Sequence, residues 1–216
     1  MEMGLLGVFI TVAIAHFLAL LSPGPDFVIV VKSAVRNKGK NALGVAFGIA
    51  AANAVYITLC LVGVGSILAA SVPVMIALKL IGGLFLIYLA VQAIRAKKSA
   101  YKNIEIEADS TPHHTSFFRE FFIGFMSGIL NPKNLLFYLS LFTVVLSSEV
   151  GFYFKLALGV WMTLVVLIWD AAIIALLSTE KVRGQFTRIA YYIDKVTGAM
   201  LGLIGATIVK SAVIQQ

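Results

Sequence analysis

Among the ionisable residues inside the long apolar runs of this 216-residue chain, four are the main candidates for chemistry: His16, Asp26, Lys133 and Asp170. Charged groups are costly in hydrocarbon, so ionisable residues at that depth typically mark paths for ions or substrates. Asp26 and Asp170 could bind a substrate ammonium or relay a proton, and His16 could shuttle one. Lys133 could hold a substrate carboxylate or pair with an acidic residue. Simpler roles stay open, because Asp26 could complement a helix dipole and His16 could be a satisfied core histidine.

Two of these charges follow proline motifs, in the stretches Ser22–Asp26 (SPGPD) and Asn131–Asn134 (NPKN). Proline cannot continue an undistorted helix, whereas a polar residue or glycine followed by proline suits a helix start. We therefore expect one helix to break near Pro23 and another near Asn131, each restarting as a half-helix. Each restart exposes backbone N–H groups and the positive end of a helix dipole, which together suit a carboxylate. A pair of kinks that only shapes packing is the alternative.

Two polar side chains one helical turn apart, Asn53 and Tyr56, could add hydrogen bonds to the same cavity, although Tyr56 could simply pack. The predicted substrate-binding residues are Ser22, Pro23, Gly24, Pro25, Asp26, Asn53, Tyr56, Asn131, Pro132, Lys133 and Asn134. The candidates for proton coupling are Asp26, Asp170 and His16. Asp194 and Lys195, near the start of the last apolar run, are expected to be structural, paired with each other or with a loop.

The composition requires a bilayer around these elements. Hydrophobic residues make up 60% of the chain and charged residues 12%, against about 25% charged in a typical soluble domain. The net charge of +7 is divided among short clusters between apolar runs, which is typical of cytoplasmic loops and disfavours nucleic acid as a partner. A single cysteine, Cys60, excludes a disulfide within one chain and a thiol-pair electron carrier.

Apolar runs of about 20 residues can each cross the hydrocarbon of a bilayer. The sequence predicts an all-α membrane protein, with residues 1–216 as a single transporter domain. The six predicted spans are Gly4–Val31, Ala42–Ala70, Val74–Ile94, Phe117–Leu146, Phe152–Leu177 and Ile189–Val213. Twelve lysines and arginines fall on one side of these spans and three on the other, which places both termini outside the cytoplasm.

The two halves of the chain share short matches in the same order. ALGV at Ala42–Val45 recurs at Ala157–Val160, and the Lys79–Gly82 stretch has a counterpart at Lys195–Gly198. With three spans per half, these matches predict two inverted repeats, about residues 1–95 and 117–216, joined by a cytoplasmic linker at about 96–116. Secondary transporters often have this arrangement, with the binding site near the midplane. Chance similarity between glycine- and alanine-rich helices is the alternative.

Three stretches carry a family resemblance: HFLALLSPGPDFV at His16–Val28, LNPKN at Leu130–Asn134 and YIDKVTGAMLG at Tyr192–Gly202. Together they resemble the LysE/RhtB family of amino-acid exporters, and most closely its threonine and homoserine exporters. The resemblance extends over essentially the whole chain. It implies an inner-membrane secondary transporter of bacteria that exports small amino acids by proton antiport. It does not imply which amino acid is carried.

Other functions fit the sequence less well. A cadmium-type metal-ion exporter of similar architecture would need soft or imidazole ligands within spans, where only His16 and Cys60 are present. The adjacent pair His113 and His114 lacks further ligands at suitable spacing, so no metal or other cofactor is expected. The sequence shows no pairing of a nucleophile with a base that would indicate an enzyme. The expected partners are a small amino acid, protons and the lipid bilayer, with a homodimer possible through small-residue helix faces.

Overall fold

The computed structural model describes residues 4–22, 24–37, 39–64, 72–97, 115–145, 150–177 and 180–214. All regular secondary structure in these ranges is helical, which confirms the all-α fold class. The α-helices are α1 (Leu5–Leu21), α2 (Pro25–Arg36), α3 (Leu43–Leu59), α5 (Val72–Arg95), α7 (Phe117–Leu130), α8 (Pro132–Val145), α9 (Phe152–Leu177) and α10 (Glu180–Ile214). A 3₁₀ turn, η1 (Gly39–Asn41), precedes α3, and a π-helical turn, η2 (Cys60–Val64), follows it.

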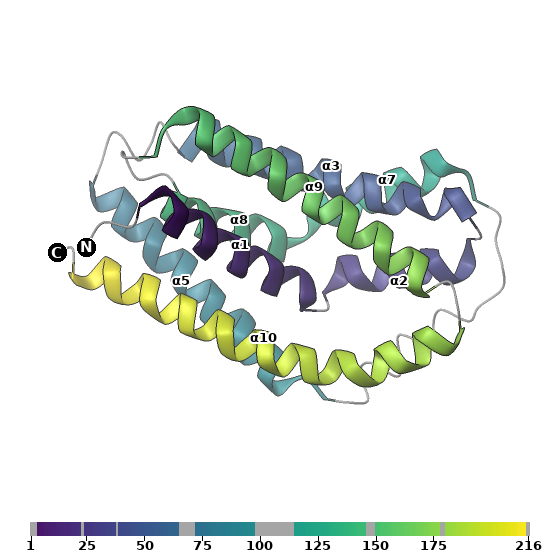
Figure 1. Ribbon diagram of the computed structural model, residues 1–216. Coiled ribbons are helices and arrows are strands. Elements are labelled where there is room, and N and C mark those ends of the chain that lie inside the picture. Colours follow the sequence, from purple (N-terminus) through teal and green to yellow (C-terminus); the bar gives the residue numbers. More distant parts are fainter. Residues whose placement is uncertain are drawn as a thin grey trace.

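The helices form an elongated bundle with both chain termini at one end (Figure 1). α3, α7 and α9 lie along one side, α5 and α10 pack against each other on the opposite side, and α1, α2 and α8 lie between them. The short helices that result from the proline motifs therefore occupy the middle of the bundle. This position gives their ends access to side chains from both sides.

Length and hydropathy support a membrane location. Three helical segments, Leu43–Val62, Phe152–Leu177 and Tyr191–Ile214, are long and apolar enough to cross a bilayer, and α1 with α2 gives a fourth if the bent pair is one span. Large apolar side chains also point outward, among them Leu6 at 72% and Leu203 at 70% exposure. Such a surface is stable only against lipid or another apolar partner. Six spans remain a prediction.

Both expected helix breaks are present. α1 ends at Leu21 and α2 begins at Pro25, with a bend of 56° between them. α7 ends at Leu130 and α8 begins at Pro132. Proline occupies the first helical position in both restarts because its missing N–H costs nothing there. The counterpart of Pro132 is thus Pro25; Pro23 lies outside the described residues.

The helix bounds differ from the predicted spans mainly at the last helix. Its apolar run begins at Ile189, but α10 already begins at Glu180, because a polar first section can be helical outside hydrocarbon. The span predicted over Phe152–Leu177 coincides with α9. The end of the second predicted span, residues 65–70, lies outside the described residues, as do His113 and His114 of the linker.

α3 and α7 approach closely enough for their backbones to touch. A Cβ at Gly48 of α3 would lie 2.6 Å from the Phe125 nitrogen, and a Cβ at Gly124 of α7 would lie 2.9 Å from the Val45 Cα. Glycine is required at both positions because any side chain would collide with main-chain atoms that cannot move aside. We call this contact the α3–α7 seam.

Candidate functional site

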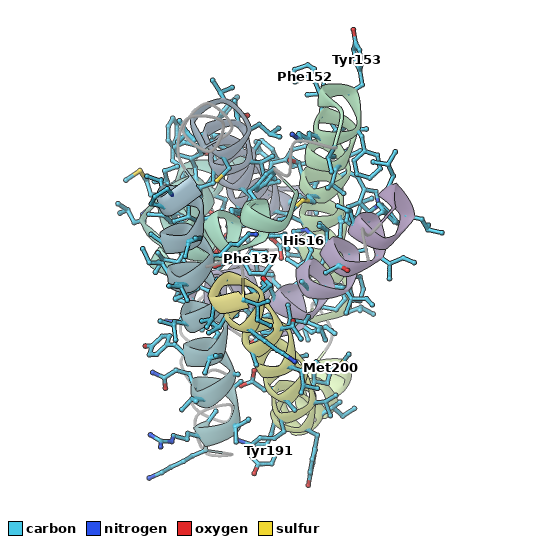
Figure 2. The ribbon with its side chains drawn as sticks, turned by 90° about the vertical axis from the view of Figure 1, so that its left-hand side faces the viewer. His16, Phe137, Phe152, Tyr153, Tyr191 and Met200 are labelled. Atoms are coloured by element: carbon cyan, nitrogen blue, oxygen red, sulfur yellow. The ribbon has the colours of Figure 1, made fainter. Side chains whose placement is uncertain are left out.

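A cavity of about 580 Å³, including the part open to solvent, lies where the ends of α1, α2 and α8 meet α3 and α9. Most of the predicted site residues contribute to its wall. The predicted residues that line the cavity are His16, Ser22, Gly24, Asp26, Asn53, Asn131, Lys133, Asn134 and Asp170. In the end-on view of Figure 2, His16 and Phe137 lie in the interior, whereas Phe152 and Tyr153 point away from the bundle.

Asp26, in the first turn of α2, connects that helix to the other broken helix. Its Oδ1 accepts a hydrogen bond from the Ser127 hydroxyl at 2.5 Å. Its Oδ2 accepts from the side-chain amides of Asn131 at 3.0 Å and Asn134 at 2.6 Å. Three neutral donors hold the carboxylate, and the N-terminus of α2 adds a favourable dipole. Asp26 therefore clamps α2 to α7 and α8.

Lys133, in the first turn of α8, reaches in the opposite direction. Its ammonium donates to the backbone carbonyls of Ser22 at 2.8 Å and Ala19 at 3.3 Å, at the end of α1. Carbonyls at the end of a helix lack an intrahelical donor, and a cation is favourable at a helix C-terminus. A cation in the first turn of α8 opposes the dipole of its own helix. The dipole of α1 compensates for that disadvantage.

The starts of the two half-helices differ in their capping. At α8, the expected N-cap is present, since the Lys133 backbone N–H donates to Asn131 Oδ1 at 3.0 Å. The Asn134 and Leu135 N–H groups donate to the Asn131 carbonyl. At α2, Gly24 supplies no side-chain cap. The first turn of α2 thus lacks the side-chain cap that the first turn of α8 has.

Asp170 and His16 line the cavity with polar atoms that lack donors. Asp170 is 8% exposed, and its carboxylate forms no hydrogen bond or ion pair in the described part of the chain. His16 is 1% exposed and donates from Nε2 to the Met162 carbonyl at 3.2 Å. Its Nδ1 is the one buried side-chain nitrogen or oxygen among the described residues without a hydrogen-bond partner. Because Nε2 carries the proton, Nδ1 is an acceptor.

The two residues predicted on α3 have different surroundings. Asn53 lines the cavity and donates from Nδ2 to the Ile49 carbonyl at 2.8 Å, which leaves its oxygen as an acceptor. Tyr56 donates to the Ile129 carbonyl in the last turn of α7 and is not among the cavity-lining residues. Pro25 is not among them either, and the side chain of Pro132 lies outside the described set. Tyr56 thus stabilises the end of α7 from outside the cavity.

Sequence reasoning missed several contributors. Ser127 and Phe137 gave no signal, because serine and phenylalanine are ordinary in membrane helices. Asp194 and Lys195 were expected to be structural, paired with each other or with a loop; the Oδ1 of Asp194 accepts a hydrogen bond at 2.8 Å from the cavity residue Ser22. Lys195 donates to the carbonyls that end α5, including that of Ala93 at 3.0 Å. A further buried acid, Glu120, was a detectable signal, since it is the one acidic residue in its apolar run.

The described residues contain no group of three or more histidine, cysteine, aspartate or glutamate side chains placed to hold a metal ion. The cavity instead combines one cation, Lys133, with the acids Asp26 and Asp170 and several neutral amides. A lipid-compatible helix bundle with such a polar cavity at two broken helices defines a membrane transport protein.

The comparisons specify the kind of transporter. The family model of the LysE type translocator matches residues 17–212, and the chain belongs to this family. The chain is therefore a translocator and not an enzyme, and it works on a small-molecule substrate in a lipid bilayer. The family membership confirms the resemblance carried by the proline motifs.

Several relatives match almost end to end. A threonine efflux protein of Salmonella typhi is 30% identical over 209 residues, which are 96% of this chain and 100% of that protein. A threonine efflux protein of Salmonella typhimurium is 30% identical over 205 residues, covering 94% and 98%. The threonine efflux protein of Escherichia coli K12 is 27% identical over 209 residues, covering 96% and 100%. No solved structure matches this chain.

Proposed function

We propose that this protein exports small amino acids that carry a hydroxyl group, such as threonine or homoserine, across the bacterial inner membrane. The names of the three threonine efflux proteins that resemble this chain support the substrate class. Within this proposal, proton antiport drives export by alternating access. The chain crosses the membrane six times as two inverted repeats, with both termini outside the cytoplasm.

The observation that carries the proposal is the division of polar groups around the cavity. The uncapped start of α2 at Gly24 and the nearby Lys133 suit a substrate carboxylate. The carboxylate of Asp170 suits the substrate ammonium or, between transport cycles, a proton. The His16 Nδ1 acceptor suits a hydroxyl donor. A carboxylate, an ammonium and a hydroxyl are the three polar groups of a hydroxyl amino acid.

The three donors on Asp26 make Asp170 the better candidate for proton coupling. A carboxylate that already accepts three hydrogen bonds gains little from a proton, which would have to displace a donor. Asp170 has no such donors in the described part of the chain. In the proposed cycle, substrate ammonium and proton therefore compete for Asp170, while Asp26 keeps the two broken helices together.

Alternating access is supported by the unequal packing of helices that correspond in the two proposed repeats. α3 and α7 pack tightly along the α3–α7 seam, whereas their counterparts, α9 and α1, make a much smaller contact. In an inverted-repeat transporter, exchanging the conformations of the two repeats opens one end and closes the other. We infer that the seam closes the end of the bundle at which α2 ends and α3 begins.

The direct test is efflux of labelled threonine from proteoliposomes with an imposed pH gradient. We expect efflux to accelerate when the receiving side is acidic and to stop in Asp170→Asn. Threonine movement that is unaffected by the gradient would contradict antiport, and cadmium efflux without threonine efflux would favour the metal-exporter alternative. Fusions of alkaline phosphatase to either terminus test the orientation, because the enzyme is active only outside the cytoplasm.

The hydroxyl preference has its own test in His16→Phe, which retains an aromatic ring but removes the acceptor. Losing one hydrogen bond costs about 1 kcal/mol, or somewhat less than tenfold in affinity. In wild-type protein, unlabelled threonine should inhibit labelled-threonine transport more strongly than valine does. In His16→Phe, we expect this difference in inhibition to disappear. An unchanged ratio of threonine to valine inhibition would remove His16 from the binding site without affecting the exporter proposal.

A further inference from the structure

One side chain in the cavity wall, Tyr138 of α8, has a polar group with no role in the proposed binding of substrate. Tyr138 lies one helical turn after Asn134, is 2% exposed and lines the cavity. In the part of the chain that the structure describes, its hydroxyl forms no hydrogen bond. That hydroxyl is not enclosed either, since His16 Nδ1 is the one enclosed side-chain nitrogen or oxygen without a partner among the described residues. The Tyr138 hydroxyl therefore opens into the cavity.

A tyrosine at this position is unfavourable unless its hydroxyl binds something. Burial of a hydroxyl without a partner destabilises a protein, whereas phenylalanine fills almost the same volume without that cost. The neighbouring residue, Phe137, lines the same cavity with an apolar ring. A second phenylalanine would therefore serve packing equally well, and the phenol of Tyr138 indicates a hydrogen-bonding group that enters the cavity.

The titratable groups that act electrostatically on this hydroxyl are all acidic. They are the carboxylates of Asp170 and Asp26 and the thiol of Cys60, and Asp170 acts most strongly. Asp26 already accepts three hydrogen bonds, whereas Asp170 accepts none in the described residues. An anion is disfavoured near two carboxylates. The group that binds at Tyr138 is therefore a cation or a neutral donor, and Asp170 is the carboxylate free to share it.

A primary ammonium fits Asp170 and Tyr138 by its number of donors. It has three N–H groups, and each needs an acceptor once the ion has left water. The two carboxylate oxygens of Asp170 can accept from two of them, and the phenol oxygen of Tyr138 can accept from the third. Both side chains line the cavity without bonding to each other in the described structure, so a donor can lie between them.

We propose that Tyr138 is a substrate-binding residue whose oxygen accepts a hydrogen bond from the substrate ammonium held at Asp170. This inference rests on the proposed export of amino acids and assigns a further contact within that site. The contact selects primary amines. A substrate with a methyl group on its nitrogen has one N–H fewer and brings the methyl group against the phenol.

Competition in proteoliposomes tests the contact. In the wild type, unlabelled threonine should inhibit transport of labelled threonine more strongly than N-methylthreonine does. In Tyr138→Phe, we expect the ratio of these two inhibition constants to fall about fivefold, which is the affinity carried by one hydrogen bond. An unchanged ratio would overturn the inference. A change in the ratio of threonine to valine in its place would assign the phenol to the substrate hydroxyl and would be equally contrary.

Thermal unfolding without added amino acid tests whether the hydroxyl has a structural role. Tyr138→Phe removes no existing hydrogen bond, so it should unfold at the wild-type temperature or above it. Tyr56→Phe is the matched control, because it removes a hydroxyl that donates to the Ile129 carbonyl and should unfold at a lower temperature. An equal decrease in both variants would show that the Tyr138 hydroxyl holds the fold together and would overturn the inference.

Stabilisation by added amino acid separates this inference from the export proposal, because it measures binding without transport. Threonine should raise the unfolding temperature of the wild type more than N-methylthreonine does, and Tyr138→Phe should reduce that difference. A reduced difference in a protein that moves no threonine across a membrane would support the contact and contradict export. An undiminished difference in a protein that transports threonine would contradict the contact alone.

Discussion

Asp26 and Lys133 hold the two broken helices together from equivalent positions with opposite charges. Each is the second residue of a helix that begins at a proline, Pro25 in α2 and Pro132 in α8. Asp26 accepts three side-chain hydrogen bonds from α7 and the start of α8, and Lys133 donates to the carbonyls that end α1. The two breaks are therefore stabilised by each other.

Asp26→Leu should destabilise the protein strongly, because it leaves the donors of Ser127, Asn131 and Asn134 without their acceptor. Buried unsatisfied groups cost about 1–3 kcal/mol each, so we expect a loss of roughly 3 kcal/mol or more. Thermal unfolding in detergent measures it. Asp26→Asn is the matched control: its oxygen can accept from both amides, and the Ser127 hydroxyl can accept instead of donating. Equal melting of the two variants would contradict the clamp.

Lys133→Met should also weaken the protein, because the side chain keeps its length but loses the ammonium. The carbonyls of Ala19 and Ser22 would then lack this donor at a helix C-terminus. We expect a cost of about 1–3 kcal/mol, measured by thermal unfolding. Lys133→Arg retains the charge and donors and should recover part of the loss. A Met variant as stable as the wild type would show that Lys133 does not cap α1.

Asp170→Asn should leave stability nearly unchanged while abolishing transport. Its carboxylate accepts no hydrogen bond in the described part of the chain, so an amide of the same shape removes no existing contact. The charge that would bind an ammonium or a proton is lost. Parallel measurement of melting and of threonine efflux checks this. The opposite pattern, lower stability with normal efflux, would assign Asp170 a structural role.

Gly48→Ala should disrupt the α3–α7 seam. The added methyl group would meet backbone atoms of Phe121 and Phe125, which can yield only if the helices separate. Overpacking of this kind costs about 1–3 kcal/mol or more, so we expect a lower unfolding temperature. Gly151→Ala is the control, because nothing lies within 4 Å of a Cβ there. Similar melting of both variants would show that the seam is loose.

The sequence predicted the helix breaks well because proline acts on its own backbone. Pro25 and Pro132 block helix continuation wherever the segment is placed, so both restarts could be read before any tertiary contact was known. The polar character of the cavity was also predictable, because ionisable residues inside apolar runs have few stable environments other than a shared interior. The first residue of α10, Glu180, was not predictable from hydropathy, because a helix can continue into polar surroundings.

The individual roles of the charges could not be predicted. Asp26 and Asp170 are both single acids within apolar runs, and nothing local distinguishes them. Asp26 is satisfied by donors that lie 101 to 108 residues away along the chain, whereas Asp170 meets none in the described residues. Glu120 is similar, since the Ser33 hydroxyl that contacts it is 87 residues distant.

By itself, the sequence determined that this protein resides in a membrane, where two of its helices break, and which ionisable side chains have to be accommodated inside. Those properties follow from hydropathy and from the backbone chemistry of proline, which act over a few neighbouring residues. Only the tertiary structure decided that Asp26 and Lys133 clamp the breaks, that Asp170 and His16 keep open acceptors, and that Glu120 contacts the Ser33 hydroxyl. Hydrogen bonding is short-ranged and directional, so its partners exist only once distant helices have packed together.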